Sequence, residues 1–135
     1  MKKLTTIGIL SLVLLICMSA RPVSHTGRIK FKSSTASASF DFFRTHHQGR
    51  GVAAAWGLKS SGGVNGFEVK KTYEDPTDPA AEWFPVYSTA CNGSRSYKCV
   101  DNQVSPGFVS YQVTAEMSDG SSVQSDISVE HIVSH

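Results

Sequence analysis

The feature that most constrains the fold is the run over residues 108–117, in which apolar and polar side chains alternate strictly from Val109 onward. Its apolar members are Val109, Tyr111, Val113, Ala115 and Met117. Successive side chains of a β-strand point to opposite faces, so this alternation predicts a strand with one buried face. Turn-forming residues bound it on both sides, Ser105-Pro106-Gly107 before and Asp119-Gly120 after.

Six further short runs of the same kind, separated by Gly, Pro, Asn, Asp and Ser, predict six more strands. They are expected at residues 37–44, 50–58, 66–73, 82–88, 97–104 and 122–129. No segment of the chain after its N-terminal part shows a sustained helical period. Seven strands in about 95 residues predict an all-β fold, a seven-stranded antiparallel immunoglobulin-like sandwich.

The order of several short motifs gives the chain a family resemblance. The motifs are Val52-Ala53-Ala54-Ala55-Trp56, the run Asn65 to Lys71, Trp83, the run Tyr97 to Asn102, and Tyr111 to Ala115 followed by Asp119-Gly120. In this the chain resembles fibronectin type III-like domains of exported proteins from Gram-negative bacteria of the Bacteroidota type. The resemblance covers roughly residues 36–131 and implies a fibronectin type III-like domain there. The segment between Trp83 and Tyr97 departs from the family pattern, because it is longer and contains a cysteine.

The N-terminal residues predict export. Lys2 and Lys3 precede an apolar run over residues 7–18, and the small residues Ser19 and Ala20 follow. This pattern is typical of a signal peptide, here residues 1–20, cut after Ser19 or Ala20. The run is too short for a membrane-spanning helix, which needs about 20 apolar residues. We therefore expect a periplasmic, cell-surface or extracellular protein with no membrane span after cleavage.

Cys17 leaves an alternative open, because a bacterial lipoprotein signal places a lipidated cysteine at the end of a short apolar run. The bulky Ile16 just before it argues against lipidation. The remaining segments are a flexible lead-in over residues 21–35, the domain over residues 36–131 and a tail over residues 132–135.

Removal of the leader would leave two cysteines, Cys91 and Cys99. An even cysteine count in an exported chain predicts a disulfide between them. Removal of Lys2 and Lys3 also leaves 11 basic against 11 acidic residues, a formal net charge of zero. Nucleic-acid binding usually leaves a basic patch or stripe, so no nucleic-acid partner is expected.

No metal or cofactor is predicted. Four of the histidines, His46, His47, His131 and His135, lie in an expected turn or near the C-terminus, where their spacing does not gather ligands. An acidic cluster around two prolines is the alternative, as a calcium site, although it lacks the Asp-x-Asp-x-Asp-Gly spacing. Its members are Glu74, Asp75, Asp78 and Glu82.

The chain also lacks the motifs of common enzymes. Gly-x-Ser-x-Gly and Gly-x-Gly-x-x-Gly are both absent, although paired carboxylates of the glycosidase kind are not excluded by sequence. The sequence-based prediction is that the protein is not an enzyme, with a small hydrolase as an alternative.

The predicted function is an interaction or structural module that binds a protein or glycan partner at the cell envelope. Binding is expected at the loops of residues 59–65, 75–82 and 90–97, or at an exposed strand edge. Trp83, Phe84 and Tyr87 are the candidate binding residues, because aromatic side chains occur there at both odd and even positions and therefore on both faces of the expected strand. The alternatives are a carbohydrate-binding module and a surface protein that self-associates through its edge strands.

Overall fold

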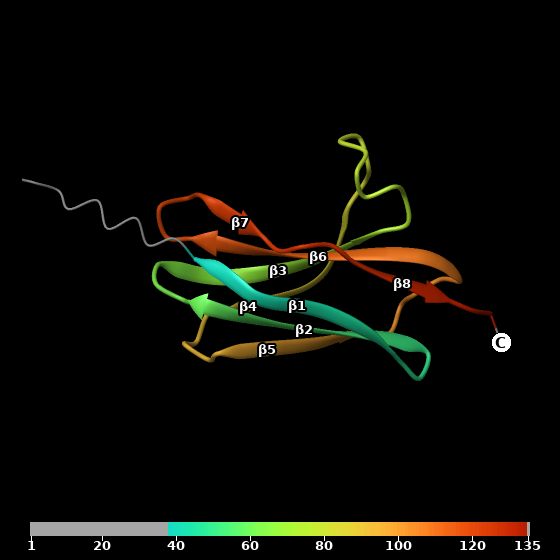
Figure 1. Ribbon diagram of the computed structural model, residues 1–135, viewed down its shortest axis with the longest axis horizontal. Helices are drawn as coiled ribbons and strands as arrows, with labels where there is room; N and C mark the ends of the chain where they lie inside the picture. Colours follow the sequence, from blue (N-terminus) through green and yellow to red (C-terminus); the bar gives the residue numbers. More distant parts are fainter. Residues whose placement is uncertain (1–37, 135) are drawn as a thin grey trace, which may run out of the picture. The chain divides into compact units, whose positions relative to one another are not determined.

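The computed structural model of the protein describes residues 38–134, which form eight β-strands (Figure 1). The strands are β1 (Ser39–Gln48), β2 (Gly51–Ser60), β3 (Val64–Thr72), β4 (Phe84–Ala90), β5 (Ser96–Asp101), β6 (Gly107–Met117), β7 (Ser122–Gln124) and β8 (Ser128–Ile132). The predicted signal peptide, the lead-in, Cys17 and His135 lie outside the described residues. Within residues 38–134 there is no helix with the length and apolar character needed to cross a bilayer.

The strands form two antiparallel sheets, which we call sheet A and sheet B. Sheet A has the order β1-β2-β5, and sheet B has the order β4-β3-β6, with both β7 and β8 paired to β6. The chain therefore changes sheet between β2 and β3, between β4 and β5, and between β5 and β6. The prediction of an all-β chain is confirmed, and its strands lie in two sheets that share one apolar core.

The predicted seventh strand, residues 122–129, is two strands, so the prediction of seven strands is corrected to eight. Ser125 causes the break. Its hydroxyl oxygen accepts a hydrogen bond from the backbone N of Val113 at 3.0 Å, and its own backbone N donates to the Val113 carbonyl at 2.9 Å. A side chain thus occupies a position in the ladder of β6 that a backbone carbonyl would fill, and regular pairing resumes only at Ser128.

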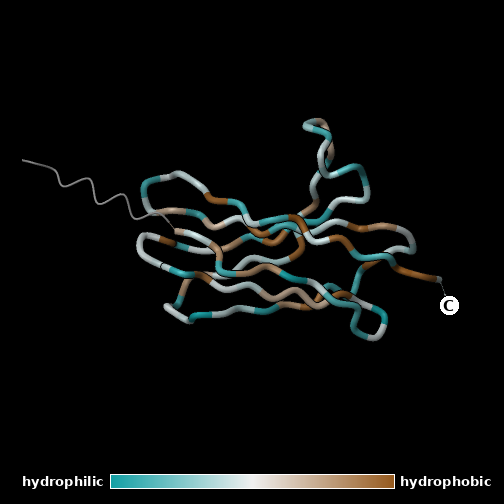
Figure 2. Tube along the Cα trace, in the orientation of Figure 1, coloured by the Kyte–Doolittle hydropathy of each residue, from teal (hydrophilic) through white to brown (hydrophobic). Residues whose placement is uncertain are grey.

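The core lies between the facing sides of the two sheets. Sheet B contributes the alternating residues of β6, all of them buried as predicted. Sheet A contributes the inward residues of β2, of which Trp56 is the largest and is fully buried. Its indole stacks on Tyr97 of β5, with ring centroids 5.7 Å apart, and meets the edge of Phe67 of β3 at 5.8 Å. Figure 2 shows hydrophilic and hydrophobic residues following one another along the strands, as this one-sided burial requires.

A buried polar bridge joins the two sheets through Asp101, the last residue of β5. Its Oδ2 accepts hydrogen bonds from Lys71 Nζ of β3 at 2.7 Å and from the Tyr111 hydroxyl of β6 at 3.0 Å. Its Oδ1 accepts from the backbone N of Gln103 at 2.9 Å, and Lys71 also donates to the Gln103 carbonyl. Burial and the Asp101 carboxylate raise the pKa of Tyr111, so its phenol stays a hydrogen-bond donor.

The structure contradicts the predicted disulfide, because Cys91 and Cys99 are both free. Cys91 follows β4, and its Sγ accepts a hydrogen bond from the Tyr97 hydroxyl at 3.5 Å. Cys99 lies two residues beyond Tyr97 on β5, paired with Ala54, which places it about 6.6 Å further along the strand. The side chain of Tyr97 therefore occupies the place beside Cys91 that a bonded cysteine would need.

We predict that Asp101→Asn lowers the free energy of unfolding by about 3 kcal/mol, because it leaves the Lys71 ammonium without its buried counter-charge. Urea denaturation at neutral pH measures this. Asp126→Asn is the control, since Asp126 is exposed and its loss should change stability by less than about 0.5 kcal/mol. Equal effects of the two substitutions would contradict the role given to the Asp101 bridge.

We also predict that the two thiols react at very different rates. Burial, aided by Asp101, raises the pKa of Cys99 to about 11, so little thiolate exists near pH 8. Iodoacetamide should label Cys91 first and Cys99 only after denaturation, as peptide mapping by mass spectrometry will show. A 91–99 cross-linked peptide in the non-reduced protein would overturn the assignment of free thiols.

Candidate functional site

The three aromatic residues predicted to bind a partner lie at or next to the edge strand β4. Phe84 is 43% exposed and Tyr87 is 41% exposed, whereas Trp83 is half-buried just before the strand. Tyr87 pairs with Val69 of β3, and its ring meets Trp56 at 6.5 Å, so it also covers the margin of the core. These residues share one edge of sheet B, but the hollows described below are lined by others.

Two of the three predicted binding loops come together at one end of the strands. The backbone N of Leu58 donates to the Arg95 carbonyl at 3.3 Å, and the N of Cys91 donates to the Asn65 carbonyl at 2.7 Å. Residues 59–65 and 90–97 therefore form one surface. The third loop, residues 75–82, belongs to a segment that projects away from the strands (Figure 1). It follows the opposite end of β3, so the structure does not bring it to the other two.

The outward face of sheet A carries a furrow that follows β2. The register of the sheet places three residues side by side at each level, one from β1, one from β2 and one from β5. The three levels are Phe42–Gly57–Ser96, Arg44–Ala55–Lys98 and His46–Ala53–Val100. In each of them the central residue is small, so the backbone of β2 forms the floor. We call these nine residues the sheet A furrow.

Two hollows lie along this furrow. One, of about 420 Å³, is lined mainly by the alanines of β2, His46, Lys98 and Val100. The other, of about 620 Å³, begins at Phe42 and Ser96 and continues over the residues that join the two loops above. Its remaining lining residues are Asp41, Leu58, Lys59, Ser60, Ser61, Gly93, Ser94 and Arg95. An extended ligand therefore has an apolar stretch and a polar stretch available on one face.

Gly57 is what allows the ring of Phe42 to lie on the furrow floor. A Cβ at position 57 would lie 2.5 Å from the Cε1 atom of Phe42 and 3.1 Å from the Arg95 carbonyl oxygen. Above the ring, the Arg44 guanidinium carbon is 5.0 Å from the ring centroid. This cation–π contact holds Arg44 over the furrow.

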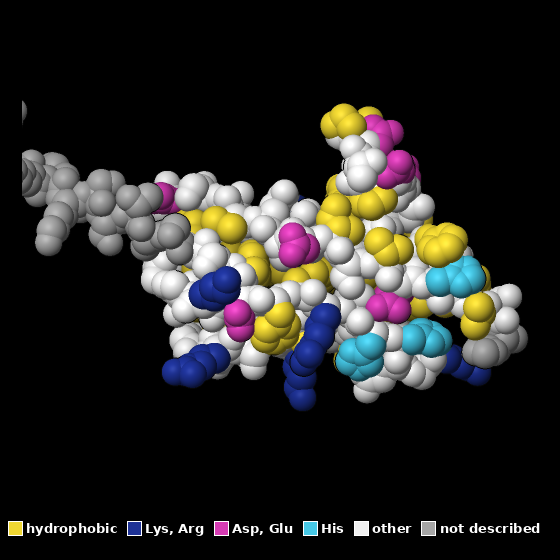
Figure 3. Space-filling view, viewed as in Figure 1, with side chains coloured by type: hydrophobic (Ala, Val, Ile, Leu, Met, Phe, Trp, Pro, Cys, Tyr) yellow, Lys and Arg dark blue, Asp and Glu magenta, His cyan; other side chains and the backbone are white. Residues whose placement is uncertain are grey.

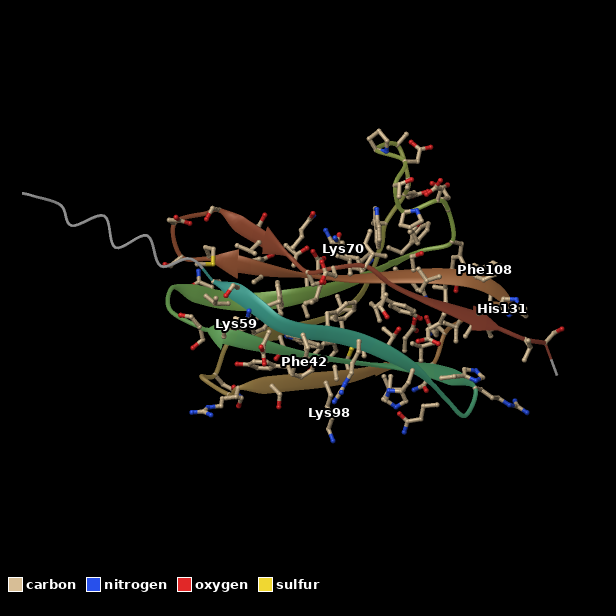
Figure 4. All side chains as sticks on the ribbon, in the orientation of Figure 1. Phe42, Lys59, Lys70, Lys98, Phe108 and His131 are labelled. Carbon is tan, nitrogen blue, oxygen red and sulfur yellow. The ribbon has the colours of Figure 1, made fainter. Side chains whose placement is uncertain are left out.

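Positive charge is concentrated on this face. The ion pairs found among residues 38–134 are Lys70–Glu68 at 2.9 Å and Lys71–Asp101 at 2.7 Å. Four further cations in or beside the furrow have no carboxylate partner in that part of the chain: Arg44, Lys59, Arg95 and Lys98. Figure 3 shows dark-blue side chains over the part of the molecule that β1, β2 and β5 form, and Figure 4 labels Phe42, Lys59 and Lys98 there.

The acidic loop and the histidines do not form a metal centre in the described structure. Asp75 accepts hydrogen bonds from the backbone N and the hydroxyl of Thr77, and these bonds lower its pKa. Asp78 accepts from the backbone N of Ala80 in the same manner. Across residues 38–134, no three His, Cys, Asp or Glu side chains gather closely enough to hold a metal ion.

The furrow was not predicted from the sequence, although the sequence does show the small residues that form its floor. Ala53, Ala55 and Gly57 alternate with the core residues of β2 and are all small. When all outward side chains of a strand are small, the strand forms the floor of a furrow wherever the neighbouring strands carry longer side chains. Which strands flank it is decided by pairing between distant segments, and periodicity within one strand does not report that.

No protein-family model matches the chain, and no curated protein matches it either. Among solved structures, it is similar to pectate lyase Pel3 from Pectobacterium carotovorum, with 11% sequence identity and a TM-score of 0.53. The match covers 65% of this chain and 26% of the pectate lyase chain, so it spans about a quarter of that enzyme. At this identity the similarity shows the fold alone.

This comparison corrects the prediction that the protein is not an enzyme. Part of a pectate lyase chain, an enzyme, has a similar fold. An all-β fold without familiar motifs therefore gives no ground for excluding catalysis. That prediction is withdrawn.

We predict that Gly57→Ala displaces the Phe42 ring from the furrow floor, because the added methyl group would overlap the ring edge. The side-chain protons of Arg44 should then lose their ring-current shift in NMR spectra. Ala55→Ser, which adds one atom at the next level of the furrow, is the control and should leave these shifts unchanged. Unaltered Arg44 shifts in Gly57→Ala would contradict the described contact.

Proposed function

We propose that residues 36–131 form an immunoglobulin-like sandwich of the fibronectin type III kind that serves as an exported interaction module. The strand arrangement supports the fold, since a three-stranded sheet faces a larger one and the chain crosses between them three times. The N-terminal sequence supports export.

The binding surface of this module is the sheet A furrow, and its partner is a protein or glycan of the cell envelope. The observation that carries the proposal is the run of three levels in which a small central residue lies between longer side chains. The two hollows follow one another along β2, an arrangement that suits an extended chain. The two adjoining loops extend this surface at one end.

The edge of β4 with Trp83, Phe84 and Tyr87 is a second proposed contact surface. It is favoured by the exposure of Phe84 and Tyr87 and by the free backbone edge of β4, which pairs only with β3 among the described strands. The two surfaces belong to different sheets, so a substitution in one surface tests its role in binding without changing the other surface.

We predict that Ala55→Trp, which fills the middle of the furrow, lowers binding to the partner at least tenfold. The measurement is retention of the labelled protein on envelope fractions and on extracellular material from the source organism, over a range of protein concentrations. Thr114→Trp is the matched control, because Thr114 lies on the outward face of sheet B between Glu68 and Gln124.

Three outcomes distinguish the surfaces. Loss of retention with Ala55→Trp alone supports the furrow. Loss with Phe84→Ser and not with Ala55→Trp assigns binding to the β4 edge and refutes the furrow. Unchanged retention in both variants refutes the proposed interaction surfaces altogether.

A further inference from the structure

The charge of the described domain is distributed unevenly. Residues 38–134 carry seven Lys and Arg against eleven Asp and Glu, a formal net charge of −4. Four of the seven cations nevertheless lie in or beside the furrow, where Asp41 is the acidic residue among the lining residues. A cationic stripe on an otherwise acidic domain selects for a negatively charged ligand on that face.

Arg44 and Lys98 face each other across Ala55. Each strand is about 4.8 Å from the next, so the backbones of these two residues are about 10 Å apart. Both side chains carry a positive charge, and an anionic group between them reduces their mutual repulsion. Ala55 between them is small, so both cations border the same stretch of the furrow floor.

The geometry of Arg44 fits the binding of a planar acidic group. Its guanidinium lies over the Phe42 ring, 5.0 Å from the ring centroid. A guanidinium in such a cation–π contact keeps its N–H donors, which bind a carboxylate through two parallel hydrogen bonds. Phe42 is thus a positioning residue for Arg44.

The larger hollow adds hydrogen-bonding groups of a different kind. Ser60, Ser61, Ser94 and Ser96 line it, and all four are exposed. Lys59 and Arg95 lie among them. A lining of hydroxyl groups and cations matches a ligand that carries many hydroxyl groups and regularly spaced acids.

Other polyanions fit this surface less well. An acidic peptide would gain no main-chain pairing, because β2, the floor of the furrow, is already paired on both sides. A nucleic acid carries one phosphate charge about every 1.7 Å along the duplex axis, and the net charge of −4 over residues 38–134 opposes the binding of so dense a polyanion.

We infer that the ligand of the sheet A furrow is an anionic polysaccharide, held by Arg44 and Lys98 at its acidic groups and by the serine-lined end at its hydroxyl groups. This inference rests on the proposed function and names the class of ligand that the same surface takes.

The test is calorimetric titration of the full chain with alginate at low and high salt. The propylene glycol ester of alginate, in which the carboxylates are masked, is the matched ligand. We expect alginate to bind at low salt, the ester not to bind, and added salt to weaken binding. Arg44→Gln and Lys98→Gln should each weaken binding about tenfold, the effect of one lost charge-assisted hydrogen bond.

Lys70→Gln is the matched control variant, because it removes the same charge from sheet B, where Lys70 pairs with Glu68. Figure 4 labels Lys70 on that sheet. It should leave the dissociation constant within about twofold. Thermal unfolding of each variant verifies that the fold persists.

Several results would overturn the inference. They are absence of binding to alginate, equal binding of the ester, an equal effect of Lys70→Gln, or equally tight binding of polyglutamate or single-stranded DNA. If Ala55→Trp still abolishes retention on envelope fractions in any of these cases, the interaction surface stands and only its ligand class is wrong.

Discussion

The Asp101 carboxylate ties the two sheets together, and the position of β5 depends on it. Among the described strands, β5 is an edge strand that pairs with β2 alone, yet its last residue bonds to Lys71 and Tyr111 of the opposite sheet. A buried carboxylate costs free energy unless it is paired and hydrogen-bonded, so this arrangement exists only when the sheets are docked. Docking fixes β5, and with it the wall of the furrow that carries Lys98.

Aromatic packing supports the end of the molecule where a disulfide was expected. Tyr97 stacks on Trp56 and also contacts Phe67, with ring centroids 4.6 Å apart. Its hydroxyl then reaches Cys91 and Asn92 at the base of the loop between β4 and β5. Large buried rings contribute more apolar area than a cysteine pair would, and here they also anchor the loop that borders the larger hollow.

The strand β2 serves the core with one face and the candidate site with the other. Its inward residues include the fully buried Val52 and Trp56, and its outward residues form the furrow floor. The fold itself gives no function, because all-β folds with two antiparallel sheets occur in proteins with unrelated activities. The similarity to part of a pectate lyase shows the fold alone. The proposed site therefore rests on its own residues: a floor of small residues, an aromatic support, and cations that have no carboxylate partner within residues 38–134.

The sequence by itself determined the elements that depend on local pattern. Period-two alternation placed the long strand β6 and its buried face, and it located most of the other strands. Tertiary structure decided the features that depend on which distant segments meet: the break in the last strand, the state of the two cysteines and the residues of the furrow. Ser125 breaks the last strand only because Val113 lies beside it. Tyr97 separates the two cysteines only because β5 pairs with β2 in one register. Arg44 and Lys98 lie on either side of Ala55 only because β1 and β5 flank β2, a pairing that no alternation within a single strand encodes.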